Sequence, residues 1–130
     1  MDLHSDRVKL GRFIGPARTI SLDKDGQPIA VTSLGQELYA DFEALRRERA
    51  ATDEVIVDWT EKISAEWLQS TMRYHSMADG GEWDVPLWVA VTHFFNHQTH
   101  HRGQVTTLLM QAGRDPGVTD LYAMLREEAK

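Results

Sequence analysis

Residues 93–104 concentrate the side chains that could do chemistry. This segment holds four of the six histidines of the chain, within a stretch that has the pattern of a helix. At about 100° per residue, His97 and His101 lie on the side of such a helix that carries an apolar stripe, whereas His93 and His100 point roughly 110° to 130° away from it. The stripe consists of Leu87, Val91, Phe94, Val105, Leu108, Leu109 and Ala112. Only His97 and His101 therefore face inward together.

Two imidazoles four residues apart can offer two nitrogen ligands to one metal ion. The helical zinc-protease motif needs Glu directly after its first His, and Gln98 occupies that position, so this class is excluded. The structural alternative is a hydrogen-bonded core histidine at His101, with the other histidines in solvent. Packing of both rings against the apolar stripe favours the metal, because buried neutral imidazoles need polar partners. From these residues alone, both interpretations stay open.

The composition excludes several classes of protein. The 130 residues are about one domain, and the absence of cysteine excludes disulfides and thiolate metal sites, so thiol chemistry would need an external thiol. The net charge of −6 argues against a nucleic-acid surface, and the basic run at residues 46–49 is mixed with acidic side chains, as in a solvated helix face. No apolar run could span a membrane, and residues 1–12 lack the apolar centre of a signal peptide. We therefore expect a soluble, cytoplasmic protein without nucleic-acid or membrane partners.

Turn-forming residues mark the first part of the chain. Residues 1–13 have helical spacing and stop before Gly15, which precedes a proline. They resemble the last part of a helix, and either a segment is missing upstream or the chain has a short N-terminal helix. Residues 17–32 are predicted to be a surface connection with a turn at residues 23–28. The aspartates of that turn lack the other ligands of a calcium loop.

A long amphipathic helix is predicted to follow. Ser33 and Gln36 have the spacing of a capping box at its start. Apolar residues then recur at steps of three and four over residues 38–67, which indicates one helix packed along its whole length. Arg49 and Thr52 interrupt this stripe. Two interpretations stay open: the bundle opens there to solvent or a ligand, or the polar residues are simply exposed.

The second half of the chain contains a hairpin and two helices in this interpretation. Residues 69–86 alternate around a glycine turn, which predicts a small β-hairpin between two helices. A helix follows over about residues 86–112, and Gly113 ends it. A short final helix is then capped by Thr119 or Asp120.

With these residues laid out, the chain resembles the DinB family, helical-bundle proteins often described as damage-inducible and regarded as metalloenzymes. The likeness is strongest over residues 93–104, and it extends to residues 6–13, 38–42, 113–121 and the hairpin. It implies an all-α, up-down-down-up four-helix bundle with a small β-hairpin between the long helices. We expect one such domain over residues 1–130, shortened at its N-terminus so that all or most of the first helix is lacking.

The resemblance also implies a divalent metal bound by three histidines, two of which match His97 and His101. The family places its first histidine ligand five residues before an Asp-Arg pair, at the position of Met1 in this chain. His4 lies one helical turn from that position and is the candidate third ligand. Otherwise the site consists of two histidines plus water, or is broken. Zinc, nickel, manganese and iron are the candidate ions.

The function implied is a metal-dependent enzyme, either a thiol-dependent transferase or isomerase that uses a low-molecular-weight thiol, or a hydrolase. Arg102 or Gln104 is expected to orient the substrate, although Gln104 could instead support a metal ligand. The alternative is a non-catalytic, stress-related helical interaction protein with a degenerate metal site. A bundle that lacks one helix exposes an apolar groove along residues 38–67 and 87–109, so we expect a homodimer.

Overall fold

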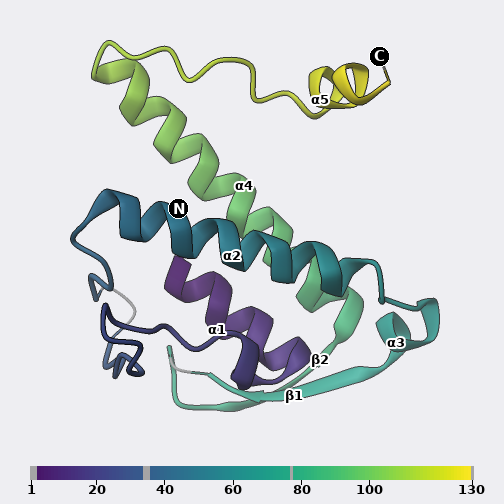
Figure 1. Cartoon of the computed structure of the whole chain (residues 1–130). Helices are drawn as coiled ribbons and strands as arrows, with labels where there is room; N and C mark the ends of the chain where they lie inside the picture. The colour runs from purple at the N-terminus through teal and green to yellow at the C-terminus, as the bar shows by residue number, and fades with distance from the viewer. Residues whose placement is uncertain (1–2, 34–35, 77, 130) are drawn as a thin grey trace.

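Three long helices form the body of the molecule in a computed structural model that describes residues 3–33, 36–76 and 78–129. They are α1 (Leu3–Ile14), α2 (Phe42–Thr60) and α4 (Leu87–Gln111). The shorter elements are the 3-10 helix η1 (Pro16–Arg18), the helices α3 (Ala65–Gln69) and α5 (Leu121–Glu128), and the strands β1 (Thr71–His75) and β2 (Glu82–Pro86). Figure 1 shows α5 at the end of an extended connection, away from this body. The prediction of a mostly helical chain with one small hairpin is confirmed.

The core lies where the three long helices meet. Leu10 of α1 and Phe94 of α4 are fully buried, and Trp59 of α2 is nearly so. The ring of Phe13 stacks on Trp59 at a centroid distance of 5.0 Å, and Phe94 meets both rings edge-on at 5.9 and 5.8 Å. Such aromatic pairs stabilise the fold beyond the area that they bury. This cluster fixes α4 against α1 and α2, and thereby positions the histidines one turn further along α4.

Helix α2 begins later than the capping-box pattern predicts. The side-chain carbonyl of Gln36 accepts a hydrogen bond from the backbone N–H of Thr32 at 2.8 Å, and the chain around Ser33 is not helical. The N-cap of α2 is Asp41, whose carboxylate accepts from the backbone N–H of Ala44 at 2.7 Å. The prediction of a start at Ser33 is therefore wrong, because the Gln36 side chain bonds to a loop N–H instead of closing a capping box and the cap in use lies two turns further on.

The apolar stripe over residues 38–67 is also not one helix. Helix α2 ends at Thr60, and α3 begins after Ser64, whose hydroxyl accepts from the backbone N–H of Trp67 at 3.1 Å. The ring of Trp67 still reaches the core, 6.1 Å from that of Trp59. The helical spacing continues across the break because both segments face the same core, so the pattern concealed the turn.

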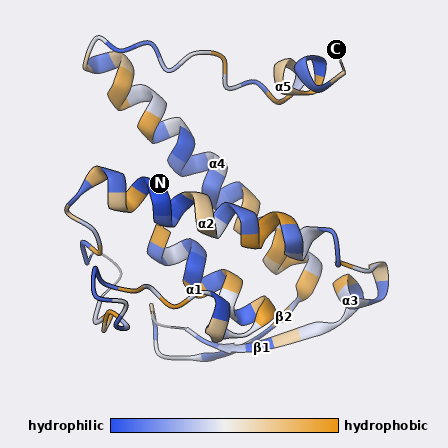
Figure 2. Cartoon of the chain, in the orientation of Figure 1, coloured by the Kyte–Doolittle hydropathy of each residue, from blue (hydrophilic) through white to orange (hydrophobic). Residues whose placement is uncertain are grey.

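Only the first half of α4 is covered by the rest of the chain. Leu87 and Phe94 are buried, whereas Val105, Leu108 and Leu109 are exposed. Figure 1 shows the second half of α4 projecting beyond α1 and α2, and Figure 2 shows apolar residues both on this half and on α5. The apolar groove expected along α2 and α4 is thus partly filled by α1. What stays exposed is the projecting half of α4.

The predicted hairpin and turns are confirmed. Strands β1 and β2 pair antiparallel in a register that sets Arg73 opposite Asp84. In the connection before α2, the Asp23 carboxylate accepts from two backbone N–H groups further along the turn. Of the two candidate caps for the last helix, Asp120 is the one used, since it accepts from the N–H of Tyr122 at 2.7 Å. Within the described parts of the chain, no helix has the length and apolarity needed to cross a membrane.

Candidate metal site

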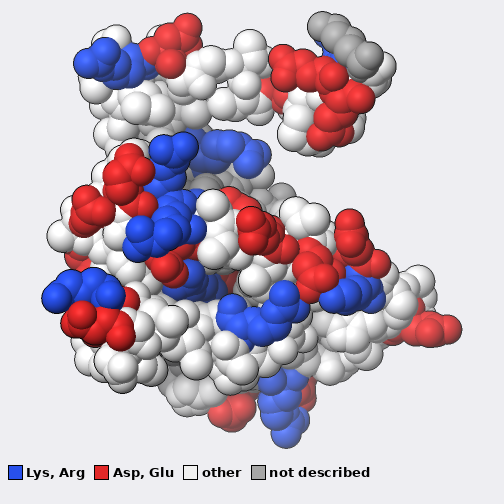
Figure 3. All heavy atoms as spheres, viewed as in Figure 1, with Lys and Arg blue, Asp and Glu red and all other residues white. Residues whose placement is uncertain are grey.

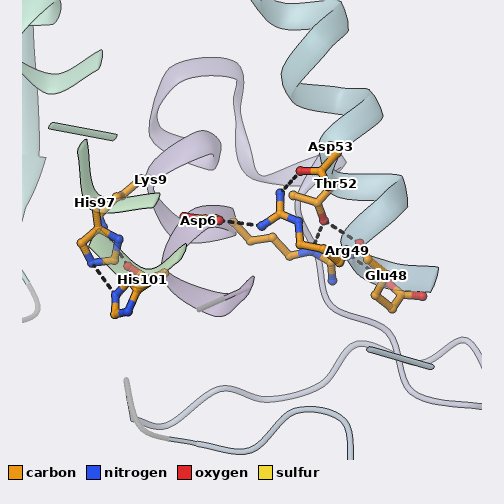
Figure 4. Close-up of polar contacts among 10 residues, drawn as sticks. Asp6, Lys9, Glu48, Arg49, Thr52, Asp53, His97 and His101 are labelled. Carbon is orange, nitrogen blue, oxygen red and sulfur yellow. Dashed lines mark hydrogen bonds and ion pairs between the residues drawn. The ribbon is translucent and has the colours of Figure 1, made fainter. Parts of the chain in front are cut away.

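His97 and His101 face each other across one turn of α4 (Figure 4). Both are half-buried, their Nε2 atoms lie 3.3 Å apart, and their ring centroids are 4.4 Å apart. Two nitrogens that each bind a tetrahedral zinc ion at about 2.0–2.1 Å are separated by about 3.3 Å. The two imidazoles therefore have the spacing of two ligands to one ion. We call them the histidine pair.

Gln104 fixes the orientation of His101. The Oε1 atom of the Gln104 side chain lies 2.7 Å from His101 Nδ1. Because an amide oxygen can only accept, Nδ1 carries the proton and donates, and Nε2 keeps its lone pair. Metal-binding histidines commonly donate their second ring nitrogen in this way. Of the two roles expected for Gln104, this contact favours support of a metal ligand.

The structure does not bring His4 to the histidine pair. His4 precedes Asp6 by two residues on α1, which is about 200° around the helix, and it is Asp6 whose charge acts on His97. His4 instead lines a separate hollow, together with Gly11 and Thr19. Within residues 3–33, 36–76 and 78–129, no three His, Cys, Asp or Glu side chains are grouped so that they could hold one ion. Met1, the position that matches the first family ligand, lies outside the described residues.

Burial and a lysine keep His97 in the neutral form that binds metal. Desolvation lowers the pKa of His97, and the charge of Lys9 on α1 lowers it further. The same two causes lower the pKa of His93, one turn earlier on α4. Figure 4 shows Lys9 beside His97. Both shifts favour the neutral imidazole, which for His97 is the form that metal binding requires.

Replacing Lys9 with Gln should raise the pKa of both His93 and His97 in metal-free protein, because a nearby positive charge is removed while the burial remains. NMR titration of the ring protons in the presence of a chelator measures both values in the parent and in Lys9→Gln. Since both imidazoles bind protons less readily in the folded than in the unfolded chain, the parent should also lose stability as the pH falls below about 6.5. Unchanged pKa values for both rings in Lys9→Gln would contradict this role of Lys9.

An ion pair between α1 and α2 lies on the other side of the site (Figure 4). Asp6 is almost fully buried, and its Oδ2 lies 2.6 Å from Nη1 of Arg49, which also pairs with Asp53. The side chain of Arg49 is only 13% exposed. The polar break in the apolar stripe is therefore not a simply exposed notch, and Arg49 lines a groove beside α4, so the interpretation as an opening to a ligand stays a prediction. The sequence did carry a signal for this ion pair. Arg49 interrupts an otherwise apolar stripe, and a cation buried at such a position needs a carboxylate partner.

Arg7 ties α1 to α2 and to the connection that precedes α2. Its Nε donates to Oγ1 of Thr52 at 3.0 Å, and its Nη1 donates to Oγ of Ser21 at 2.9 Å. Its Nη2 forms an ion pair with Glu48 at 2.8 Å. We call these contacts the Arg7 network. The network therefore holds α1, the helix that carries Lys9, against α2.

The run of mixed charge at residues 46–49 is only partly solvated. Arg46 is exposed, as predicted, whereas the side chains of Glu48 and Arg49 are largely covered by their contacts with α1. Figure 3 shows acidic and basic side chains interspersed over the body of the molecule on the face in view. The prediction of a fully solvated face is wrong, because periodicity does not reveal which charges have a partner on another helix.

Arg102, the other residue expected to orient a substrate, borders a hollow of about 430 Å³ beside the second half of α4. The walls of this groove are apolar and include Leu3, Phe42 and Val105. The guanidinium of Arg102 lies 3.4 Å from Oγ1 of Thr99. Arg102 thus stands next to His101 in sequence and at the edge of a groove, and its contact with a substrate stays a prediction.

Comparison with protein families matches residues 18–130 to the model described as DinB family. Comparisons with curated proteins and with solved structures gave no significant match. The matched range contains α4 and the histidine pair, but not α1. The roles of Asp6, Arg7 and Lys9 therefore rest on the structure alone.

Proposed function

The chain belongs to the DinB family, whose members often bind metal, and from this premise we propose that it binds one divalent metal ion through His97 and His101 and acts as a metal-dependent enzyme. The observation that carries the proposal is the 3.3 Å between the two Nε2 atoms. The bond from His101 to Gln104 supports it, because this bond leaves a lone pair directed toward His97. Zinc, nickel, manganese and iron are the candidate ions.

A divalent cation held by His97 and His101 would supply Lewis acidity, which would lower the pKa of a bound thiol or water molecule. The side chains prepare the site for it. Gln104 orients His101, while burial and Lys9 keep His97 unprotonated. Because the chain contains no cysteine, a thiol would come from a low-molecular-weight compound. Thiol-dependent transfer or isomerisation, and hydrolysis, are the reactions that this chemistry fits.

Metal content tests the proposal. Protein purified without a histidine tag or chelator should contain about one ion per chain by elemental analysis, since the histidine pair offers one position. Zinc or nickel added to chelated protein should raise Tm, because an ion at 100 times its Kd stabilises the folded state by about 2.7 kcal/mol. A metal-free protein whose Tm responds to neither ion would contradict the proposal.

A second candidate function is a non-catalytic helical interaction protein with a degenerate metal site. The observation that favours it is the absence, among the described residues, of a third ligand grouped with the histidine pair. Two protein ligands leave an ion more exposed to exchange than three do. Stoichiometric metal that survives dialysis supports the enzyme, whereas metal lost on dialysis supports this second function.

We also propose that the protein is a homodimer, since a broad apolar surface stays exposed. Leu108 and Met110 of α4, and Leu121 and Tyr122 of α5, are each more than 60% exposed. Large apolar side chains left exposed in this number often mark a protein–protein contact. A second copy of the chain is the simplest cover, because one two-fold contact would bury the surface on both copies.

Charge favours α5 of one copy as the element that fills the groove beside α4 of the other. Helix α5 ends in Arg126, Glu127 and Glu128, while Arg46 and Arg102 border the groove, and Arg102 also lines a hollow with Glu127 of its own chain. Figure 3 shows acidic side chains gathered on α5 and basic ones at the base of the projecting α4. Apolar residues and charges are therefore complementary between the two surfaces.

Light scattering at micromolar concentration should give twice the mass of the chain. Leu121→Glu should shift the protein toward the monomer, because it places a charge in the buried contact. Val57→Glu, at an exposed position of α2 outside this surface, is the matched control and should stay dimeric. A well-folded parent monomer would rule out the dimer.

A further inference from the structure

A cavity of about 270 Å³ opens between α1, the hairpin and α4, close to the histidine pair. Its walls are largely apolar and include Phe13, Val85 and Val89. His93 also lines it, and the His93 ring lies 5.8 Å from that of His97 between centroids. Small-molecule pockets span roughly 300–1,000 Å³, so the space suits a compact organic molecule.

The charges around this cavity have one sign. Lys9 and Arg12 line it, and no carboxylate does so among the described residues, although the chain as a whole carries a net charge of −6. The two cations are three residues apart on α1, so they project from the same side of that helix. A recess lined by one sign of charge between apolar walls attracts ligands of the opposite sign.

Arg12 is held by groups that do not neutralise it. Its guanidinium carbon lies 4.4 Å from the centroid of the Tyr74 ring, and its Nη2 donates to the carbonyl oxygen of His75 at 3.3 Å. In the described parts of the chain, no carboxylate forms an ion pair with Arg12, whereas Arg7 and Arg49 each have such a partner. A guanidinium fixed in this way can bind a carboxylate through two parallel hydrogen bonds.

We propose that this cavity binds a small organic anion, with its carboxylate between Lys9 and Arg12 and an aromatic or branched aliphatic body against Phe13 and Val89. The claim that this anion is the substrate of the metal site rests on the proposed function of the histidine pair. Its binding to the cavity does not depend on metal.

Benzoate, benzamide and inorganic phosphate, each titrated into the full chain with a chelator present and followed by NMR, test this proposal. Benzoate should bind at least about tenfold more tightly than benzamide, which lacks the charge, and than phosphate, which lacks the apolar body. Arg12→Gln should weaken benzoate binding about tenfold, whereas Arg18→Gln, at an exposed arginine outside the cavity, should not change it. Ala90→Phe should abolish binding, because the larger side chain fills the cavity.

Equal affinities for benzoate and benzamide, or unweakened benzoate binding in both cavity variants, would overturn the proposal. Thermal unfolding of each variant verifies that it folds, and should Arg12→Gln not fold, Ala90→Phe decides. Metal content is measured in parallel. A parent that holds metal and does not bind benzoate refutes the anion site and leaves the proposed function intact. A parent that binds benzoate and never holds metal keeps the anion site and refutes its role as the substrate site of a metalloenzyme.

Discussion

Replacing His97 or His101 with alanine should remove most of the bound metal, whereas His93→Ala and His100→Ala should leave it in place. Only the first two imidazoles converge, with their Nε2 atoms 3.3 Å apart, while His93 lines the neighbouring cavity and His100 is exposed. Metal that binds only the folded state stabilises it, so the two ligand variants should lose the zinc-dependent stabilisation of about 2.7 kcal/mol expected at 100 times Kd. Elemental analysis, together with Tm measured with and without zinc, gives both results.

His4→Ala is the informative companion to these variants. It should keep the metal, because His4 lines a hollow on the other side of α1 from Asp6. Loss of metal in His4→Ala would identify His4 as the third ligand. It would also mean that α1 is rotated about its axis relative to the structure described above. Loss in His100→Ala with retention in His97→Ala would contradict the orientation of α4.

Replacing Arg7 with alanine should destabilise the protein by about 3–5 kcal/mol, a large part of the roughly 5–15 kcal/mol that holds a typical domain together. The side chain of Arg7 is largely buried, and its removal leaves Glu48, Thr52 and Ser21 without their shared donor. Urea unfolding followed by circular dichroism measures the change. Arg7→Lys should fall between the parent and Arg7→Ala, because an ammonium keeps the charge and cannot reach all three acceptors.

Arg18→Ala is the matched control for the Arg7 network. Arg18 also forms an ion pair, at 2.7 Å from Asp58, but the two side chains are 51% and 38% exposed. Exposed pairs typically contribute about 0–1 kcal/mol, so this variant should unfold close to the parent. If Arg7→Ala lost no more stability than Arg18→Ala, the network would not be what joins α1 to α2.

Features that depend on neighbouring residues could be predicted from the sequence. The hairpin followed from strand-like alternation on both sides of a glycine turn, and α4 from its periodicity and the glycine after it. The convergence of His97 and His101 followed from the helical repeat alone. These features need only short-range information, and the pattern of residue types carries it.

Features that depend on distant residues could not be predicted. The carboxylate that neutralises Arg49 lies 43 positions away at Asp6, and no periodicity connects the two. The break between α2 and α3 was hidden because both segments face one core, which preserves the helical spacing of apolar residues. The position of His4 also depends on the rotation of α1 about its axis, and contacts with residues more than 40 positions away, such as those of Arg7 with Glu48 and Thr52, accompany that rotation.

X-ray absorption at the metal edge of tag-free protein tests the central claim most directly, because it counts the imidazole rings around the ion. The spacing within the histidine pair predicts two imidazoles per ion with metal–nitrogen distances of about 2.0–2.1 Å, and oxygen or sulfur at the remaining positions. His97→Ala should reduce the imidazole scattering together with the metal content. A spectrum of the parent that contains metal but no imidazole scattering would contradict the claim that His97 and His101 hold the ion.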